Sequence, residues 1–526
     1  MGKHFKNYVI NLLVPAVLFG VVTGAIVAVI LTLYKWLANK VISFSSVGYY
    51  FVSNHLYFIP VVLIGLFLIA YIFSICYKHT PNLRGGGIPT TIGILRDIIT
   101  LKWLRTLIGM FFMSLVTFLI GVPLGNEGPA VQMGTAIGRG AISPFNEKHK
   151  PWTRYSMTGG ACAGFAVATG APVSGIMFAV EEAHQRVSPM IIIVAATAVM
   201  FAVGLSEILA PIFNVSTALF PELTAITLSI KDVWLPLVVG LVMGLFAVIL
   251  LKYYRVIRAL FKSVLGKISP CIKIFIIFVI VFGVGLISGD FISTGHSLIH
   301  QIILESPEAL MLLIILLVRS TLTLSANTNG ITGGMFLPLL AIGAVVSALT
   351  GKLLIGVFGL SSEFYSVILT LGITACISGV MKMPITAILF AVEALGGGNN
   401  ILYVVVVSVV AFIITEIFKE KSITDMVVEH RQESLLKDKT STIVEEFYIV
   451  QPNSFAEGKQ LRDILWPAMC YVLSVKKNEY AKEEDANPHG GHALVEGDVL
   501  HLRYITYDRD KTEEKIYHIV GKSIEK

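Results

Sequence analysis

Eleven apolar blocks, separated by short polar interruptions, occupy most of the first 418 residues. Several blocks are shorter than the roughly 20 residues that a simple spanning helix needs, and glycine and proline interrupt many of them. Backbone that breaks at membrane depth must be enclosed by protein or line a water-filled cavity. The pattern therefore predicts an all-α polytopic membrane protein with tilted, short and broken helices. The blocks lie at 8–34, 56–76, 104–122, 158–180, 189–214, 233–251, 271–288, 309–324, 335–360, 365–381 and 400–418.

Charged residues divide the chain into two parts. Residues 1–415 contain 24 Lys and Arg against 13 Asp and Glu, whereas residues 416–526 contain 16 against 21. About 9% of the first part and about 33% of the second are charged, compared with roughly 25% in an average soluble domain. This excludes a single soluble globule, a nucleic-acid-binding protein and a disulfide-bonded secreted domain. A membrane domain followed by a small soluble module remains.

Basic residues at the N-terminus suggest the orientation of the chain. Lys3 and Lys6 precede an apolar run that is too long for the core of a signal peptide. Positive residues favour the cytoplasmic side of a membrane. We therefore expect a multi-pass protein of the cell (cytoplasmic) membrane, with its C-terminal domain in the cytoplasm.

The cysteines predict no metal centre and no disulfide framework. No two of them have CxxC spacing, and the count of five is odd. We expect structural thiols, and no metal or cofactor. The five are Cys76, Cys162, Cys271, Cys376 and Cys470.

Two pairs of segments indicate an internal repeat. GAPVSGIMFAVEEA (170–183) aligns with KMPITAILFAVEAL (382–395), and GNEGPAVQMG (125–134) resembles GGMFLPLLAIG (333–343), at offsets of 212 and 209. Transporters are often built from two repeats, frequently inverted, with the substrate site where the repeats meet. The alternative is chance recurrence of common glycine, proline and apolar words. The alignment alone leaves open whether the repeat is inverted.

Three glycine-rich words could form an anion site: RGGGIP (84–89), GNEGP (125–129) and GGMFLP (333–338). Proline suits the first turn of a helix, and glycine lets backbone N–H groups approach a ligand. Free N–H groups at a helix N-terminus attract an anion without a full positive charge. A buried lysine or arginine would instead cost several kcal/mol in a membrane. Close packing of glycine is the alternative explanation of each word.

Glu127, inside GNEGP, is a candidate gate. A carboxylate at a helix N-terminus is itself an anion in an anion site. It could occupy that site, be displaced by a permeant ion, and leave by taking a proton. The alternative is a solvated loop carboxylate.

Glu182 is a candidate proton site. Glu181 matches Glu393 in the repeat and so is predicted to be architectural, whereas Ala394 stands opposite Glu182. This asymmetry favours a specific role for Glu182. The alternative is a solvated helix end near His184.

Together these words resemble the CLC family of chloride channels and chloride/proton antiporters. GNEGP resembles the family's GREGP, GGMFLP its GxFxP, and GGGIP its GSGIP, and PVSGIMFAVEE matches as well. The similarity in order and spacing covers residues 8–430. It implies a homodimer of CLC-like inverted-repeat protomers in the lipid bilayer, each with its own pore, and repeats at approximately 80–215 and 290–420.

The resemblance also implies roles for individual residues. Glu127 corresponds to the gating glutamate, and Glu182 to the internal proton-transfer glutamate of the antiporters. Three positions depart from the family pattern: Gly86 replaces a serine, Asn126 replaces an arginine, and Thr424 stands near an expected tyrosine. The implied anion-binding residues are Gly86, Gly87, Ile88, Gly125, Asn126, Gly128, Met335, Phe336, Leu337 and Thr424.

The implied function is transmembrane anion transport, as proton-coupled exchange of chloride or another small anion. Glutamate at position 182 favours exchange, while the altered central site leaves open a passive voltage- or pH-gated channel. Fluoride/proton antiport is a further alternative, because the family's fluoride exporters also depart at the serine. No histidine lies in a catalytic or metal motif, so an enzyme is not expected. The +11 charge of residues 1–415 disfavours cation transport.

The C-terminal part is predicted to be a small α+β domain. We expect a charged linker helix at 416–440, strands at 442–450, 471–477 and 498–505, a helix at 454–465 and a loop at 488–491. GKQLRDILWP (458–467) and VEGDVLHLR (495–503) resemble the TrkA-C (RCK-C) domain of potassium-transport regulators. This divides the chain into a transport domain (1–430) and a linker with a regulatory domain (431–526). The resemblance implies a small regulatory ligand or dimerisation; an inert dimer strut is the alternative.

Overall fold

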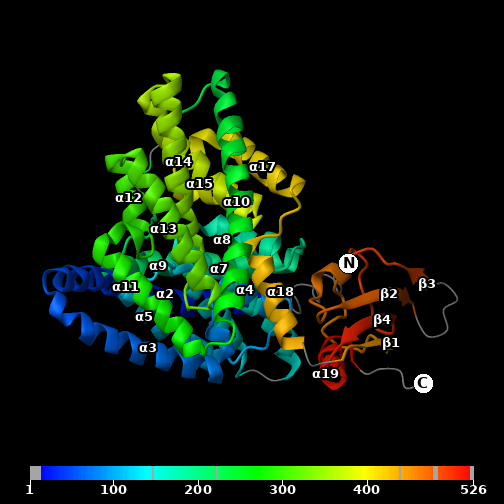
Figure 1. Cartoon of the computed structure of the whole chain (residues 1–526). Helices are drawn as coiled ribbons and strands as arrows, with labels where there is room; N and C mark the ends of the chain where they lie inside the picture. Colours follow the sequence, from blue (N-terminus) through cyan, green and yellow to red (C-terminus); the bar gives the residue numbers. More distant parts are fainter. Residues whose placement is uncertain are drawn as a thin grey trace.

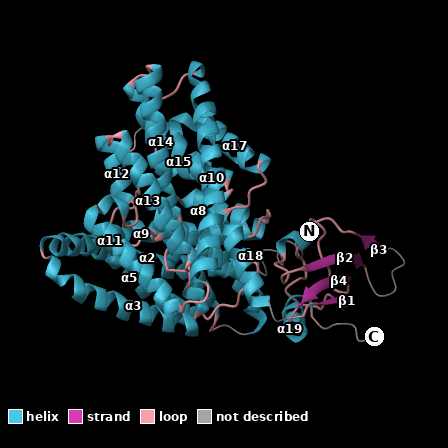
Figure 2. Ribbon diagram, in the orientation of Figure 1, coloured by secondary structure: helices cyan, strands magenta, loops and turns pink. Residues whose placement is uncertain are grey.

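The computed structural model shows a large helical part joined to a small domain with a β-sheet (Figure 1). Within the described residues, ten helices are long and apolar enough to cross a membrane, which agrees with the predicted polytopic membrane protein. Figure 2 shows strands only in the C-terminal domain. Lys3 and Lys6 lie outside the described residues, which are 13–144, 147–220, 223, 226–436, 440–477 and 484–521.

The membrane part combines long helices with short ones, as the interrupted blocks predicted. The block at 158–180 is divided at Gly170 (φ +68°), so that one helix ends there and the next begins at Pro172. The block at 8–34 instead continues as one helix of 41 residues. The helices are α2 (Val14–Asn54), α3 (Ile59–His79), α4 (Ile88–Leu95), α5 (Trp103–Ile120), α6 (Glu127–Ile142), α7 (Thr153–Thr169), α8 (Pro172–Phe178), α9 (Pro189–Phe213), α10 (Trp234–Leu265), α11 (Pro270–Ile287), α12 (His296–Glu305), α13 (Ala309–Thr328), α14 (Phe336–Phe358), α15 (Tyr365–Met381), α16 (Pro384–Ala394), α17 (Ile401–Ile417) and α18 (Ile423–Leu436).

The helices α8 and α16 show that the repeat is inverted. The Glu181 carboxylate accepts hydrogen bonds from the backbone N–H groups of Ile385 and Thr386, the second and third residues of α16, at 2.9 and 2.7 Å. The Glu393 carboxylate does the same for α8, at 2.7 and 2.9 Å. Each helix is therefore capped by a carboxylate from the C-terminal end of the other, which requires an antiparallel pair. The predicted architectural role of Glu181 is confirmed.

We expect the Glu181→Gln variant to lower stability by about 2 kcal/mol, because hydrogen bonds to a charged group contribute about 1.5–3 kcal/mol. Glutamine also places an NH₂ group against the N–H groups of α16. The midpoint of thermal unfolding in detergent should fall by a few degrees. Glu207→Gln, at an exposed position of α9, is the control and should leave the midpoint unchanged. Equal midpoints for the two variants would contradict the reciprocal capping.

The C-terminal domain contains a four-stranded antiparallel sheet of order β1-β4-β2-β3. The three predicted strands are confirmed, whereas β3 and the final helix were not predicted. A separate apolar core includes Tyr448, Leu500 and Ile516. The elements are β1 (Thr442–Ile449), β2 (Cys470–Lys476), β3 (Glu484–Ala486), β4 (Val499–Thr506) and α19 (Arg509–Val520).

The predicted helix at 454–465 is wrong. Gly458 has a φ of +75°, and only Leu461–Asp463 form a short 3₁₀ turn. The backbone N–H groups of Gly458 and Leu461 donate to carbonyls of Leu494 and His492, at 2.8 and 3.0 Å. The backbone hydrogen bonds of this segment are therefore made with a distant loop, and no helix forms.

The single linker helix predicted at 416–440 is also wrong. The chain turns after α17, where Lys419 has a φ of +53°, and α18 starts only at Ile423. Its first two turns are buried and pack against α4, because ITDMVV provides an apolar face. The helix continues past residue 430, the end of the expected transport domain. Helix α18 therefore contributes to the interior of the membrane part.

Candidate anion and proton site

The three glycine-rich words meet in the interior of the membrane part. Gly125 and Gly334 pair as an antiparallel bridge, with two backbone hydrogen bonds of 2.7 Å. The N–H of Gly85 donates to the carbonyl of Gly330 at 3.0 Å. The prolines of the three words lie in the first turns of α4, α6 and α14, as predicted. Three buried helix N-termini are thereby brought to one place.

Glycine is required where these loops touch. A Cβ atom on Gly128 would lie 2.0 Å from the carbonyl oxygen of Gly86 and 2.6 Å from Cα of Gly334. A Cβ atom on Gly87, whose φ is +74°, would lie 2.1 Å from the carbonyl oxygen of Gly128. Close packing, the alternative explanation of the glycine words, is therefore real. It also allows the helix N-termini to converge.

Glu127 is the first residue of α6 and is fully buried, so the alternative of a solvated loop carboxylate is wrong. Its Oε2 lies over Gly125, since a Cβ atom there would be 2.4 Å away. Burial disfavours its charge, whereas the nearby backbone N–H groups of Glu127 and Leu337 and the ammonium of Lys35 favour it. Among the described residues, neither carboxylate oxygen has a hydrogen-bond partner of good geometry. The side chain therefore lies between α6 and α14 without strong fixation.

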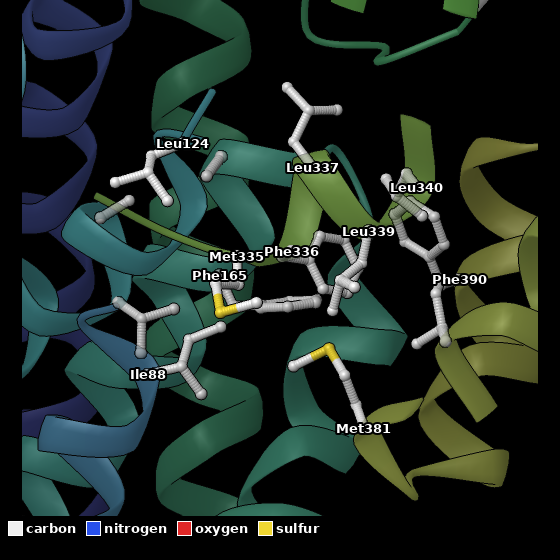
Figure 3. Packing of buried hydrophobic residues seen from close by; sticks show 14 of the residues in the cluster. Ile88, Leu124, Phe165, Met335, Phe336, Leu337, Leu339, Leu340, Met381 and Phe390 are labelled. Atoms are coloured by element: carbon white, nitrogen blue, oxygen red, sulfur yellow. The ribbon is translucent and has the colours of Figure 1, made fainter. Parts of the chain in front are cut away.

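A small cavity lies on the other side of the start of α14. Its volume is about 10 Å³, close to the minimum for one water molecule. In Figure 3, Ile88 and Met381 lie on the side of Phe336 opposite to Leu337. The cavity brings together five of the predicted anion-binding residues with five others. It is lined by Gly86, Ile88, Pro89, Asn327, Met335, Phe336, Met381, Ile423, Thr424 and Val427.

Phe336 is held rigidly between the two repeats. Its ring makes edge-on contacts with Phe165 and Phe390, at centroid distances of 5.1 and 5.2 Å (Figure 3). Such pairs contribute about 0.5–1.5 kcal/mol beyond apolar burial. The N-terminus of α14 is therefore fixed in position relative to α7 and α16.

Asn327 is a cavity residue that sequence reasoning missed. It lies in the last turn of the apolar helix α13, and its Nδ2 would lie 3.4 Å from a Cβ atom on Gly86. Its Oδ1 accepts a hydrogen bond from the Tyr254 hydroxyl at 3.3 Å, which directs Nδ2 toward Gly86. An N–H donor thus stands beside the position where Gly86 lacks a side chain. The one sequence signal was a polar residue at the end of an apolar block.

At the start of α4, the backbone N–H of Ile88 is not free to bind an anion. The N–H of Ile88 donates to the carbonyl of Gly86 at 2.8 Å, so this N–H is already used. Ile88 contributes an apolar wall to the cavity instead. Asn126 precedes α6, is partly exposed, and its carbonyl accepts the N–H of Ala130 at 3.0 Å.

Glu182 lies in a π-helical turn, Ala179–Ala183, directly after α8. It is buried, so the alternative of a solvated helix end is wrong. The Thr424 side chain lies close to its carboxylate, and Oε1 has no hydrogen-bond partner among the described residues. The Arg96 guanidinium donates to the backbone carbonyl of Glu182 at 2.8 Å. Thr424 therefore contacts both the cavity and this second acid.

Solved structures with a similar fold are known. A slow cyanobacterial Cl⁻/H⁺ antiporter superposes with a TM-score of 0.67 at 22% identity, covering 80% of this chain and 97% of that one. A CLC-type fluoride/proton antiporter superposes with a TM-score of 0.61 at 22% identity, covering 77% of this chain and 95% of that one. A eukaryotic CLC transporter superposes with a TM-score of 0.64 at 16% identity, covering 80% of this chain and 74% of that one. At these identities the likeness establishes the fold.

A family model establishes the relationship in sequence. The model described as voltage gated chloride channel matches residues 65–416, which is about two thirds of the chain. This range includes the three glycine-rich words, Glu127, Glu182 and Asn327. The chain therefore belongs to the voltage-gated chloride channel family, commonly called CLC.

Proposed function

We propose that this protein exchanges chloride for protons across the membrane. The observation that carries the proposal is a continuous series of contacts that leads from Glu127, through the small cavity, to Glu182. The buried Glu127 lies against Leu337 at the start of α14, and the residues just before Leu337 line the cavity. Thr424 lines the same cavity and contacts Glu182. Two buried acids thus flank one small cavity at helix N-termini.

In this mechanism Glu127 competes with the anion. Its carboxylate occupies the outer part of the site, where backbone N–H groups of α14 stabilise negative charge. Protonation removes its charge, so that it leaves and an anion takes its place. Backbone N–H groups at Met335, Phe336 and Leu337 then hold the anion. Glu182 receives the proton from Glu127 by a separate route and passes it to the cytoplasm.

Two other transport modes are the alternatives. A fluoride/proton antiporter is among the structurally similar proteins, and Gly86 provides no hydroxyl that would favour chloride. A passive channel would use the same cavity without proton movement.

The test is anion flux with simultaneous pH recording in liposomes that contain the purified protein. A chloride gradient should drive protons against their own gradient. Comparison of chloride, fluoride and nitrate identifies the preferred anion. Anion flux without proton movement would favour the channel, and no anion flux at all would refute the proposal.

Asn327→Leu should weaken chloride binding about ten-fold, because one hydrogen bond to a charged group contributes about 1.5 kcal/mol. Leucine keeps the branched shape of asparagine but lacks the amide, so it removes both the N–H donor beside Gly86 and the acceptor of the Tyr254 hydroxyl. Isothermal titration calorimetry of chloride into chloride-free protein measures the change. Asn329→Leu, outside the cavity lining, is the matched control. Unchanged affinity in the Asn327 variant would exclude this residue as a ligand.

The family resemblance also supports proposals for the assembly. We propose a homodimer in the cell membrane, with residues 1–430 as the transport domain and the C-terminal domain in the cytoplasm. Residues 431–526 would be a linker and a TrkA-C-like regulatory domain. Light scattering of the detergent-solubilised protein tests the dimer, since a monomeric mass would contradict it.

A further inference from the structure

A second cavity, of about 460 Å³, lies between the membrane part and the C-terminal domain. This volume falls within the range of about 300–1,000 Å³ that is typical of small-molecule sites. The membrane part contributes the end of α4, the loop after it, the last turn of α6 and the start of α7. The C-terminal domain contributes Phe455, Leu465, Pro467 and one face of α19. Both parts are needed to complete the cavity.

The charges of this cavity favour an anion. The cavity is lined by five basic side chains and by two acidic ones, Asp97 and Glu514, which leaves an excess of three positive charges. Lys515 pairs with Asp97 at 2.7 Å and Lys150 pairs with Glu514 at 3.5 Å. Lys511 pairs with Asp508, which does not line the cavity, at 2.6 Å. The basic residues are Arg139, Lys150, Arg154, Lys511 and Lys515.

The remaining wall is apolar and partly aromatic. The ring centroids of Phe455 and Tyr155 are 6.0 Å apart, and both residues line the cavity. Basic groups beside an apolar wall suit a ligand that joins phosphate to a flat, weakly polar ring. Inorganic phosphate alone would leave this wall without a partner. The other apolar lining residues are Ile94, Ile99, Leu101, Met157, Leu465, Pro467 and Ile519.

Two helices connect this cavity to the anion site. Helix α4 begins at Ile88, in the wall of the small cavity, and its last turn reaches the large one. Helix α6 begins with Glu127 and carries Arg139 in its last turn. Arg154 joins the two parts, because it donates to the carbonyl of Leu95 and to that of Trp466, each at 2.7 Å. A ligand here would contact the far ends of two helices that start at the anion site.

We propose that this cavity is a regulatory site for a soluble nucleotide, and that the bound nucleotide changes the rate of anion transport through α4 and α6. The transport half of this inference rests on the proposed function, whereas the binding half does not. The phosphate groups contact Arg139 and Lys511, and the base lies against Phe455.

Calorimetry on the full-length protein tests the binding half, with ATP, AMP, inorganic phosphate and a short-chain phosphatidylglycerol as separate probes. We expect ATP or AMP to bind, and Arg139→Gln to weaken that binding at least ten-fold. Arg462→Gln, at an exposed arginine of the C-terminal domain that does not line the cavity, should change nothing. No heat with either nucleotide, or binding of the lipid alone, would overturn the proposal. Equal affinity in both variants would place the nucleotide elsewhere and overturn it as well.

Flux in liposomes tests the coupling half. A bound nucleotide should change chloride flux at least two-fold in the wild type and in Arg462→Gln, but not in Arg139→Gln at the same concentration. Nucleotide binding without an effect on measurable chloride flux would overturn the coupling. Nucleotide binding to a protein that moves no anion under any condition would refute the proposed function and leave the binding site intact.

Discussion

Replacing Glu127 with glutamine is expected to abolish proton movement while anion flux continues. The amide has nearly the shape of the protonated acid but takes up no proton, so it represents the open state of the outer site. Its neutral head no longer competes for the N–H groups at the start of α14. A chloride gradient across liposomes should then drive anions passively, with proton uptake no greater than in protein-free liposomes.

The pH dependence of flux distinguishes this account from a merely structural role of Glu127. In the wild type, lower pH protonates the carboxylate and empties the outer site, so anion flux should increase as pH falls. In Glu127→Gln the flux should be independent of pH, because the gating group no longer titrates. Gln132→Glu would be a poor control, because it adds a buried charge; Glu207→Gln, at an exposed acid, is suitable. Proton uptake by the Glu127 variant, driven by chloride, would contradict the mechanism.

Local features of the site were predictable because they depend on short stretches of chain. Proline in the first turn and glycine before it determine where α4, α6 and α14 begin. The repeat also follows from sequence, since Glu181 and Glu393 occupy matching positions and cap each other's helices. The direction of the second repeat was not predictable, because similarity between segments says nothing about how each crosses the membrane.

Features that depend on distant contacts were missed. Asn327 gains its position only because α13 places it beside Gly86 and because Tyr254 orients its amide. The segment at 454–465 has a composition suited to a helix, but its backbone pairs with residues 492–494 instead. Helix α18 appeared to be a solvated linker from its charge, although its first two turns pack into the membrane part. In each case the partner is more than 25 residues away.

Glu182→Gln should uncouple the transporter in a different way from Glu127→Gln. Glutamine at 182 accepts no proton from Glu127, so proton exchange with the cytoplasm stops. Glu127 still titrates from the outside, and anion flux should therefore still increase as external pH falls. Two variants without proton transport would thus differ in the pH dependence of their anion flux.

The adjacent acid provides a matched control for this variant. Glu181 caps α16 and does not line the cavity, so Glu181→Gln should lower stability but keep proton coupling in the folded protein. The measurement is the ratio of proton to chloride flux in liposomes for the three proteins. If Glu182→Gln keeps the wild-type ratio, Glu182 does not carry the proton. If only Glu181→Gln lowers the ratio of proton to chloride flux, the proton route passes through the repeat interface between α8 and α16. It then does not pass through Thr424 and the cavity.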